Sequence, residues 1–348
     1  MASSSHCPTK VLKARVWTMS SRFIGVPKKT DFKLTVERIP DLDTGEYLAE
    51  AVYISVDPHI RAISDELQVG SAMPGLQIAR VIQSLNRKFP VGSYVHGAFG
   101  WRTLTVDKGQ TRSVPTYVLP DYLNDKSMEV SYGLSLLGVP GLAAYFGLTE
   151  VLKPRRGETL VVSSVAGGVG NFAAQIAKKI LGCNVIGITS RDNKAKWCKD
   201  RGGIDQTISY MDQDVVEQLN KFAPEGVDYY FDTVGGDIAN SVLSCMNDNG
   251  KIAQCGAISG YCNDVPAHLN QLEIIEKELK VEGFQVTRWK DRWFEAIDQL
   301  YSYHVGKRMS TYPPVYAAGF ESIPDEFIRL FRSFNVGKVV VIVPSNVL

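Results

Sequence analysis

The chain has 348 residues, 45% hydrophobic and 22% charged, which is typical of a soluble globular protein long enough for two domains. Lys and Arg number 38 and Asp and Glu 37, so no charge excess favours nucleic acid or a membrane surface as a partner. No apolar run approaches the roughly 20 residues of a membrane-spanning helix, and residues 1–8 lack the apolar centre of a secretory signal.

The cysteines are scattered, and no two are spaced as Cys-x-x-Cys. This spacing argues against a structural zinc site or a disulfide framework and for a reducing compartment, so we expect a cytosolic protein. The six cysteines are Cys7, Cys183, Cys198, Cys245, Cys255 and Cys262.

Residues 1–136 predict a β-rich, partly open barrel domain. Residues 32–37 alternate between apolar and polar side chains, and residues 47–56 form a longer strand pattern. Frequent glycines and prolines between residues 70 and 100 divide the remainder into short segments, and long helical patterns are missing.

Pro58 ends the strand pattern of residues 47–56, so His59 and Arg61 are expected in a loop or a first helical turn. His59 has three interpretations: a metal ligand, a proton donor or a surface polar residue. The first is disfavoured because no second ligand lies at metal-binding spacing. Arg61 is expected either near a phosphate or carbonyl group or in solvent.

A second domain is predicted to begin near residue 137, where a mostly apolar stretch becomes helical after Pro140. Residues 159–162 then predict a buried strand, followed by the turn Ala166-Gly167-Gly168 and an amphipathic helix beginning beside Val169. The amide N–H groups at the start of such a helix bind anions, which predicts a pyrophosphate site on Gly167, Gly168, Val169 and Gly170. Val165 stands where the full G-x-G-x-x-G fingerprint has its first glycine.

The end of the next predicted strand, residues 184–188, indicates which dinucleotide binds. An NAD enzyme places an acidic residue about 20 positions past the glycines, but this chain has Thr189-Ser190-Arg191 and then Lys194. Hydroxyls and cations suit the 2′-phosphate of NADP. The alternative is that Ser190 and Asp192 only cap the next helix, and Asp192 itself weighs against a phosphate. We favour NADP.

Strand and helix patterns continue to alternate, which predicts an α/β doubly wound parallel sheet of the Rossmann type in residues 137–311. The further strands are expected at 206–208, 227–232, 251–255 and 280–285, and the helices at 192–201, 212–222, 238–246, 269–279 and around Trp293. Residues 312–348 read as a strand at 312–316, a helix at 323–334 and a β run at 337–343. We expect this tail to return to the first domain.

Several segments in the same order resemble the zinc-free medium-chain dehydrogenase/reductase superfamily, and within it the prostaglandin reductase group. That group includes leukotriene 12-hydroxydehydrogenases and plant alkenal double-bond reductases. The matching segments are 56–61, 138–148, 166–170, 230–236, 255–259 and Asn335 with Gly337-Lys338. The resemblance implies a GroES-like first domain and a metal-free, NADPH-dependent reduction of the carbon–carbon double bond of α,β-unsaturated ketones and aldehydes. It also implies a homodimer.

The resemblance further implies site residues. Lys194 would meet the 2′-phosphate, Tyr210 would line the adenosine side, and Thr233 stands where the family usually has Asn. The nicotinamide half would be surrounded by Cys255, Gly256, Ala257, Ile258, Ser259, Phe284, Gln285, Val286 and Asn335.

Tyr261 matches the family tyrosine beside the substrate carbonyl. Hydride addition to the β-carbon produces an enolate, whose oxygen needs a donor, and a phenol is protonated at neutral pH. The alternative is an ordinary loop aromatic residue. His59 replaces a family tyrosine on the substrate side, and Gly260 replaces bulkier residues, so substrate preference does not carry over.

Three functions remain open at this point: the enone reductase, a quinone reductase of similar build, and an NADPH-binding sensor without turnover. Zinc-dependent alcohol oxidation is disfavoured, because Gly75-Leu76-Gln77 stands where that chemistry needs metal ligands. The resemblance does not distinguish eicosanoids, alkenals from lipid peroxidation and other enones, and it leaves the cellular direction of the reaction open.

Overall fold

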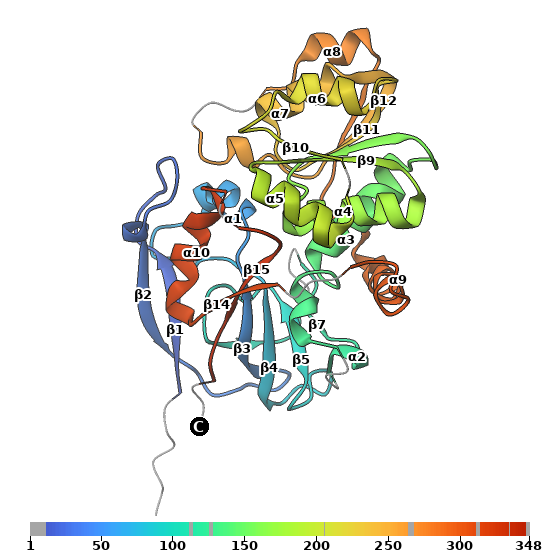
Figure 1. The fold of residues 1–348 in the computed structure, drawn as a ribbon. Coiled ribbons are helices and arrows are strands. Elements are labelled where there is room, and N and C mark those ends of the chain that lie inside the picture. Colours follow the sequence, from blue (N-terminus) through green and yellow to red (C-terminus); the bar gives the residue numbers. More distant parts are fainter. Residues whose placement is uncertain are drawn as a thin grey trace, which may run out of the picture.

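The computed structural model describes residues 12–110, 114–124, 128–204, 206–263, 268–310, 314–333 and 335–345. Its two large sheets lie one above the other in Figure 1. The upper sheet is parallel and covered by helices, whereas the lower sheet is mostly antiparallel. The predicted fold class, a doubly wound sheet with a β-rich domain, is confirmed.

The upper sheet has six parallel strands in the order β10-β9-β8-β11-β12-β13. The chain places β9 and β10 on one side of β8 and then crosses to build β11 to β13 on the other side. At such a reversal a crevice opens beyond the carboxyl ends of the two central strands. The strands are β8 Thr159–Val162, β9 Asn184–Thr189, β10 Gln206–Ser209, β11 Val227–Asp232, β12 Met246–Gln254 and β13 Lys280–Gly283.

Alternate side chains of these strands enter two different cores. Leu160 and Val162 pack with α3, α4 and α9, whereas Val161 packs with α6 and α7. Each fully buried Leu or Val side chain stabilises the fold by about 1.5–3 kcal/mol. The helices are α3 Val139–Phe146, α4 Gly168–Gln175, α5 Asp192–Trp197, α6 Val215–Phe222, α7 Gly236–Leu243, α8 Gln271–Glu276 and α9 Trp293–Val305. Single π-helical turns extend α3, α4 and α5 through Gly147–Leu152, Ile176–Leu181 and Cys198–Gly202.

The lower part is built on a seven-stranded sheet with the path β14-β15-β3-β4-β5-β7, in which β6 pairs with β3. A separate hairpin joins β1 to β2. The strands are β1 Lys13–Met19, β2 Phe32–Arg38, β3 Tyr47–Ser55, β4 Gln77–Ser84, β5 Tyr94–Gly97, β6 Leu104–Asp107, β7 Tyr117–Val118, β14 Val315–Ala318 and β15 Val339–Ile342. Its helices are α1 His59–Ile63, α2 Asp121–Asn124 and α10 Ile323–Leu330.

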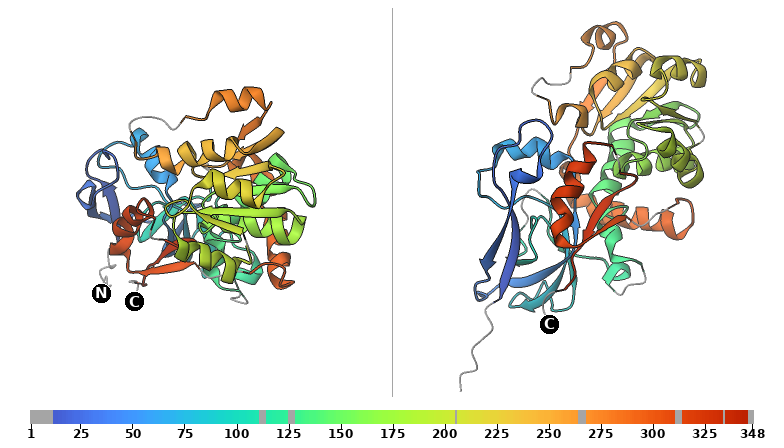
Figure 2. Two further views of the ribbon diagram at one scale, coloured as in Figure 1. Left: turned by 45° about the horizontal axis from the view of Figure 1, so that its top comes forward. Right: turned by 60° about the vertical axis from the view of Figure 1, so that its left-hand side comes forward.

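The end of the chain lies against its beginning, as the red and blue ribbons of Figures 1 and 2 show. β15 pairs antiparallel with β3, and β14 pairs parallel with β15. Phe327 of α10 packs edge-on against Trp101, with ring centroids 5.4 Å apart. The domain boundaries at residues 136 and 311 stay a prediction, because strand pairing does not fix where a folding unit ends.

Most predicted elements are present, but several ends were predicted wrongly. α7 stops at Leu243, because Met246 already pairs with Val227 in the sheet. α6 begins only at Val215, because the Asp214 carboxylate caps it by accepting the Glu217 N–H at 2.8 Å. α8 stops at Glu276, shortly before Glu278 takes a positive φ of 50°. Residues 312, 313 and 334 of the predicted tail elements lie outside the described residues.

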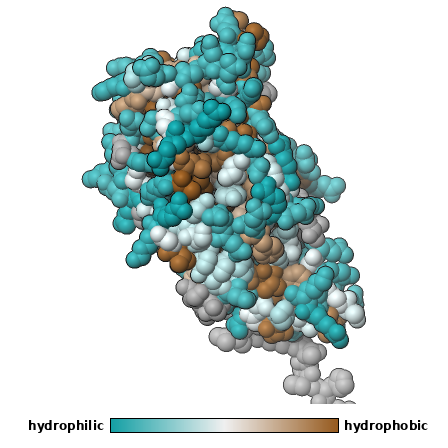
Figure 3. Space-filling model, turned by 90° about the vertical axis from the view of Figure 1, so that its right-hand side faces the viewer, coloured by the Kyte–Doolittle hydropathy of each residue, from teal (hydrophilic) through white to brown (hydrophobic). Residues whose placement is uncertain are grey.

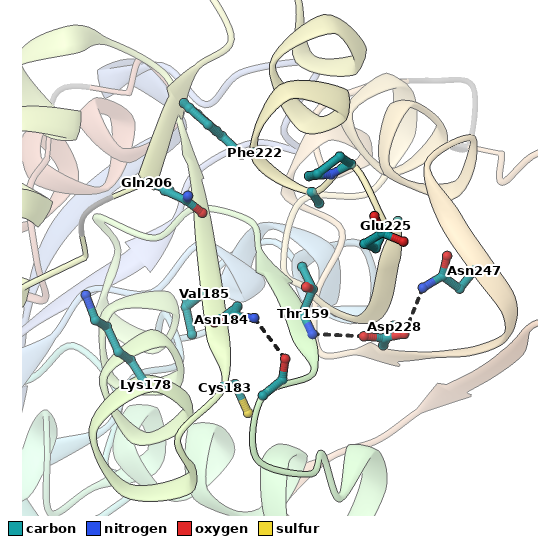
Figure 4. Close-up of a pocket in the computed structure, with 14 residues that line it drawn as sticks. Thr159, Lys178, Cys183, Asn184, Val185, Gln206, Phe222, Glu225, Asp228 and Asn247 are labelled. Atoms are coloured by element: carbon teal, nitrogen blue, oxygen red, sulfur yellow. Dashed lines mark hydrogen bonds between the residues drawn. The ribbon is translucent and has the colours of Figure 1, made fainter.

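A hollow of about 610 Å³ lies at the amino-terminal edge of the parallel sheet, opposite the crevice (Figure 4). Its floor includes Asp228, whose carboxylate accepts the Thr159 N–H at 2.9 Å and the Asn247 side-chain amide at 2.8 Å. The Asp228 carboxylate therefore already has partners. This hollow is separate from the candidate site described below.

The face that carries α9 is mainly hydrophilic, and its apolar side chains gather in small groups (Figure 3). Among the described helices, none is both long and apolar enough to cross a membrane.

Candidate cofactor and active site

The predicted glycine turn lies at the carboxyl end of β8 and leads directly into α4. Gly167 is the N-cap residue of α4, and no side chain caps the helix, so its first N–H groups have no side-chain acceptor. A Cβ on Gly170 would lie 2.4 Å from the Ser164 carbonyl oxygen, which requires glycine at this position. The geometry is that of an anion-binding turn.

Val165, the departure from the dinucleotide fingerprint, has a partner on the next strand. Its side chain packs over Gly187 of β9, where a Cβ would lie 2.6 Å from Val165 Cγ1. The Val165 N–H also donates to the Ile188 carbonyl at 3.0 Å. Val165 can therefore replace the first glycine of the fingerprint because Gly187 on β9 leaves room for its side chain.

Ser190, Arg191 and Lys194 follow β9 at the same edge. The Ser190 hydroxyl is buried and has no hydrogen-bond partner among the described residues. Lys194 is also buried, and burial together with the nearby Arg191 guanidinium lowers the pKa of its ammonium. The Tyr210 N–H donates to the Thr189 carbonyl at 3.0 Å, which brings Tyr210 to the end of β9.

The alternative that Ser190 and Asp192 only cap α5 is not what the structure shows. The N-cap residue is Arg191, and no side-chain cap bond is present. Ser190 instead contributes a buried hydroxyl that has no hydrogen-bond partner among the described residues, directly before the cationic Arg191.

Asp232, at the end of β11, organises the loops on the other side of the crevice. Its buried carboxylate accepts the Val234 N–H at 2.8 Å, the Gly235 N–H at 3.0 Å and the Ser163 hydroxyl at 3.0 Å. Ser163 Oγ in turn accepts the Thr233 N–H at 2.9 Å. This network holds Thr233 beside the residues that lead into the glycine turn.

Residues 255–259 lie against the loop after β11. The Ile258 N–H donates to the Thr233 carbonyl, and the Ser259 N–H donates to the Val234 carbonyl at 3.0 Å. Burial raises the pKa of the Cys255 thiol to about 12, and Asp232 adds to the shift. Cys255 is therefore a thiol and not a thiolate at neutral pH.

Tyr261 folds back over this loop. Its hydroxyl oxygen accepts the Ala257 N–H at 3.2 Å and lies 3.3 Å from where a Cβ on Gly256 would be. Burial raises its pKa above the ordinary 10, with a smaller contribution from the Cys255 and Asp232 charges and an opposing one from the Ala257 N–H. Within the described part of the chain the Tyr261 O–H donates to no acceptor.

Phe284, Gln285 and Val286 follow β13 directly. The Phe284 ring is buried against Phe231 and Trp289. Gln285 is exposed, and the Val286 carbonyl accepts the Trp293 indole N–H at 3.2 Å.

Residues 335–338 of the tail lie against the glycine turn that follows β8. The Gly337 N–H donates to the Ala166 carbonyl at 2.7 Å, and Gly337 forms a parallel bridge with Gly167. Asn335 is half-buried, and its amide donates weakly to the Gly337 carbonyl at 3.4 Å. The structure therefore brings Asn335 next to the glycine turn.

His59 is the first residue of α1 and is exposed. Burial would raise the pKa of Asp57, but Lys338 and, after it, the nearby His59 imidazole lower it. No hydrogen bond joins His59 to Tyr261 within the described part of the chain. Arg61 is buried: it donates to the Gly25 carbonyl at 3.2 Å and pairs with Asp65 at 3.2 Å. Of the two alternatives for Arg61, the solvent-exposed one is therefore excluded, and the carbonyl that Arg61 meets is that of Gly25.

Comparison with known proteins identifies the family. The family described as zinc-binding dehydrogenase matches residues 168–302, and the one described as N-terminal domain of oxidoreductase matches residues 15–114. Prostaglandin reductase 1 of Bos taurus is 38% identical over 335 residues, which are 95% of this chain and 99% of that protein. The chain belongs to the medium-chain dehydrogenase/reductase family. The resemblance inferred from the sequence is confirmed.

Two further members of the medium-chain dehydrogenase/reductase family extend the comparison. The 2-alkenal reductase (NADP(+)-dependent) of Nicotiana tabacum is 32% identical over 333 residues, 92% of this chain and 94% of that protein. The crystal structure of CurA in complex with NADPH from Vibrio vulnificus has a TM-score of 0.86 and 31% identity, covering 95% of this chain and 99% of that one.

Although one family description mentions zinc, the described residues of this family member contain no group of three or more His, Cys, Asp or Glu placed to hold a metal ion. Sequence reasoning gave no role to Asp232, Asp57 or Lys338, which the structure places at the site. Asp57 and Lys338 are in contact although 281 positions separate them, and no local pattern signals such a pair.

Proposed function

We propose that the protein binds NADPH across the carboxyl edge of the parallel sheet. Gly167 to Gly170 would hold the pyrophosphate, and Ser190, Arg191, Lys194 and Tyr210 the adenosine 2′-phosphate. The unpaired Ser190 hydroxyl and the glycine cradle at Gly170 support this fit. The nicotinamide half would lie among Thr233, residues 255–259, residues 284–286 and Asn335.

We propose that the reaction is reduction of the carbon–carbon double bond of α,β-unsaturated ketones and aldehydes. The relatives named prostaglandin reductase 1 and 2-alkenal reductase support this class of substrate. In the same proposal residues 137–311 are the cofactor domain, and residues 1–136 with 312–348 are the substrate domain.

The observation that carries the proposal is the Tyr261 hydroxyl, which is anchored by the Ala257 N–H while its own proton has no acceptor among the described residues. The chemistry that NADPH supplies when bound is a hydride for the substrate β-carbon. Negative charge then develops on the carbonyl oxygen, and Tyr261 donates a hydrogen bond to that oxygen. Because its pKa is raised, Tyr261 is protonated at neutral pH and is a hydrogen-bond donor to the oxygen as charge develops there. The α-carbon then takes a proton from water or from Tyr261, and in the second case water returns a proton to Tyr261.

His59 is proposed as the second substrate-side group. It is exposed at the start of α1 and lies near Asp57, beside the tail that lines the cofactor site. An imidazole there can donate a hydrogen bond to a polar substituent of the substrate.

The experiment that tests the function is NADPH oxidation, followed by absorbance, with a medium-chain alkenal, beside NADH and a simple quinone. We expect alkenal turnover that prefers NADPH, and a kcat about tenfold or more lower in Tyr261→Phe, because an oxyanion donor is lost. Tyr122→Phe is the matched control, since that hydroxyl donates to Asp298 of α9 at 3.0 Å, away from the site. Quinone turnover without alkenal turnover would make the protein a quinone reductase, and NADPH binding without turnover a sensor.

We further propose a cytosolic homodimer. The five cysteines of the described residues are free thiols, as a reducing compartment allows. β13 is an edge strand whose four residues are all exposed, and Leu272 and Ile275 of the adjacent α8 are 59% and 71% exposed. An unpaired edge beside apolar side chains suits a second copy of the chain. Analytical ultracentrifugation should give twice 38.4 kDa.

A further inference from the structure

An ion pair between a buried lysine, Lys338, and a partly buried aspartate, Asp57, lies against the glycine turn. Lys338, which is 8% exposed, donates from Nζ to Asp57 Oδ1 at 2.7 Å and to the Val56 carbonyl at 2.8 Å. The second carboxylate oxygen of Asp57 accepts the Ser55 hydroxyl. Both charges therefore have specific partners, as buried charges require.

The pair joins three segments that are far apart in the chain. Asp57 follows β3, Lys338 immediately precedes β15, and the alkyl stem of Lys338 covers Gly168, the first residue of α4. A Cβ on Gly168 would lie 3.3 Å from Lys338 Cδ and 3.6 Å from its Cα. One residue earlier, the Gly337 N–H bonds to the Ala166 carbonyl at 2.7 Å. The tail is thus fixed to the lower sheet at one end and to the turn at the other.

We propose that Lys338, held by Asp57, is a positioning residue of the NADPH site that locks residues 335–338 against the glycine turn. This inference rests on the proposed function. The ammonium acts through Gly337 and Gly168, which set the position of the turn and of Asn335. It is not a phosphate ligand, because its charge is compensated by Asp57 at 2.7 Å.

The two roles predict opposite results for Asp57→Asn. A phosphate ligand freed from its carboxylate would bind the anionic cofactor equally well or more tightly. A positioning lysine that loses its charged partner would let the tail loosen, and NADPH would bind more weakly.

The first experiment measures the NADPH Kd by fluorescence for the wild type, Asp57→Asn and Lys338→Met. We expect the Kd to rise about tenfold or more in Lys338→Met, and severalfold in Asp57→Asn, because loss of a supporting contact displaces the groups it holds. Lys277→Met is the matched control. Like Lys338, Lys277 bonds both main-chain carbonyl and carboxylate oxygens, with two carbonyls at 2.9 and 2.8 Å instead of one and a carboxylate at 2.8 Å, but it lies at the end of α8. The NADPH Kd of Lys277→Met should equal that of the wild type.

The second experiment needs no cofactor. Amide hydrogen exchange at Gly337 reports its bond to Ala166, and we expect faster exchange in Lys338→Met than in the wild type or in Lys277→Met. If Lys338→Met does not fold, the double variant Asp57→Asn/Lys338→Met, which buries no unpaired charge, gives the same two measurements.

An unchanged NADPH Kd together with unchanged amide exchange at Gly337 in Lys338→Met would overturn the inference while leaving the proposed function intact. A higher Kd for Lys338→Met together with NADPH binding by Asp57→Asn that equals or exceeds that of the wild type would also overturn it and make Lys338 a phosphate ligand. A wild-type protein that does not bind NADPH would overturn both the inference and the proposed function.

Discussion

We predict that the buried side chain of His96 in β5 lowers the free energy of unfolding at acidic pH. Its side chain is fully buried, stacks on Tyr117 with centroids 4.9 Å apart, and meets the edge of Trp293 at 6.4 Å. Nδ1 lies 3.4 Å from the Pro115 carbonyl, and Nε2 has no partner among the described residues. Burial disfavours the charged ring and lowers the pKa of His96 from 6.5 to about 4, although the Pro115 carbonyl opposes the shift.

The sign follows from proton uptake. Between pH 6.5 and about pH 4 the unfolded chain binds a proton at His96 and the folded chain does not, so stability is complete above pH 6.5 and falls as the pH falls through this window. At about 1.4 kcal/mol per unit, the whole shift corresponds to about 3 kcal/mol. Between pH 7 and pH 5 the loss from this residue alone is about 2 kcal/mol.

The assay is urea unfolding followed by tryptophan fluorescence at pH 7 and pH 5, for the wild type and for His96→Phe. Phe keeps a flat ring against Tyr117 but does not titrate, so the wild type should lose about 2 kcal/mol more between the two pH values than the variant does. His268→Asn, a change at an exposed histidine, should keep the wild-type difference. Equal losses in the wild type and His96→Phe would refute the reasoning, because some other group would then account for the pH dependence.

Two further substitutions test the cofactor edge. Gly170→Ala places a methyl group 2.4 Å from the Ser164 carbonyl oxygen, so we expect about 1–3 kcal/mol of lost stability in urea unfolding and weaker NADPH binding. Gly283→Ala is the control, because a Cβ there meets nothing within 4 Å, and it should change the free energy of unfolding by less than about 0.5 kcal/mol. Equal effects of Gly170→Ala and Gly283→Ala would contradict the interpretation that Gly170 is required by its close contact with Ser164. Lys194→Met should weaken NADPH binding by about 2 kcal/mol, roughly thirtyfold in Kd, and leave NADH binding unchanged in calorimetry. A parallel loss for NADH would mean that Lys194 does not contact the 2′-phosphate.

The parallel sheet could be predicted because its signals are local. Residues 227–232 carry Val227 and the aromatic run Tyr229-Tyr230-Phe231, which favours a strand buried on both faces, and β11 Val227–Asp232 has those bounds. Helix ends were predicted less well, because they depend on partners. No local sequence pattern around Met246 indicates that this residue pairs with Val227 in the sheet.

The candidate site also has parts that could be predicted from local sequence and parts that could not. The glycine turn and the residues after β9 are read from short motifs, since a helix N-terminus and a strand end are set within a few residues. The contact between Asp57 and Lys338 could not be read, because a lysine and an aspartate 281 positions apart have no shared spacing. Val165 was a departure from the fingerprint until the structure showed Gly187 beneath it.

These long-range contacts explain why the site needs both ends of the chain. A reversal in strand order opens a crevice but supplies only loops from one sheet, and loops alone hold a ligand loosely. Here Lys338, paired with Asp57, packs its alkyl stem against Gly168 of the turn, and Asp232 accepts the hydroxyl of Ser163 shortly before the turn. Contacts from distant parts of the chain therefore hold the turn before any ligand arrives, so a bound dinucleotide has less backbone to order.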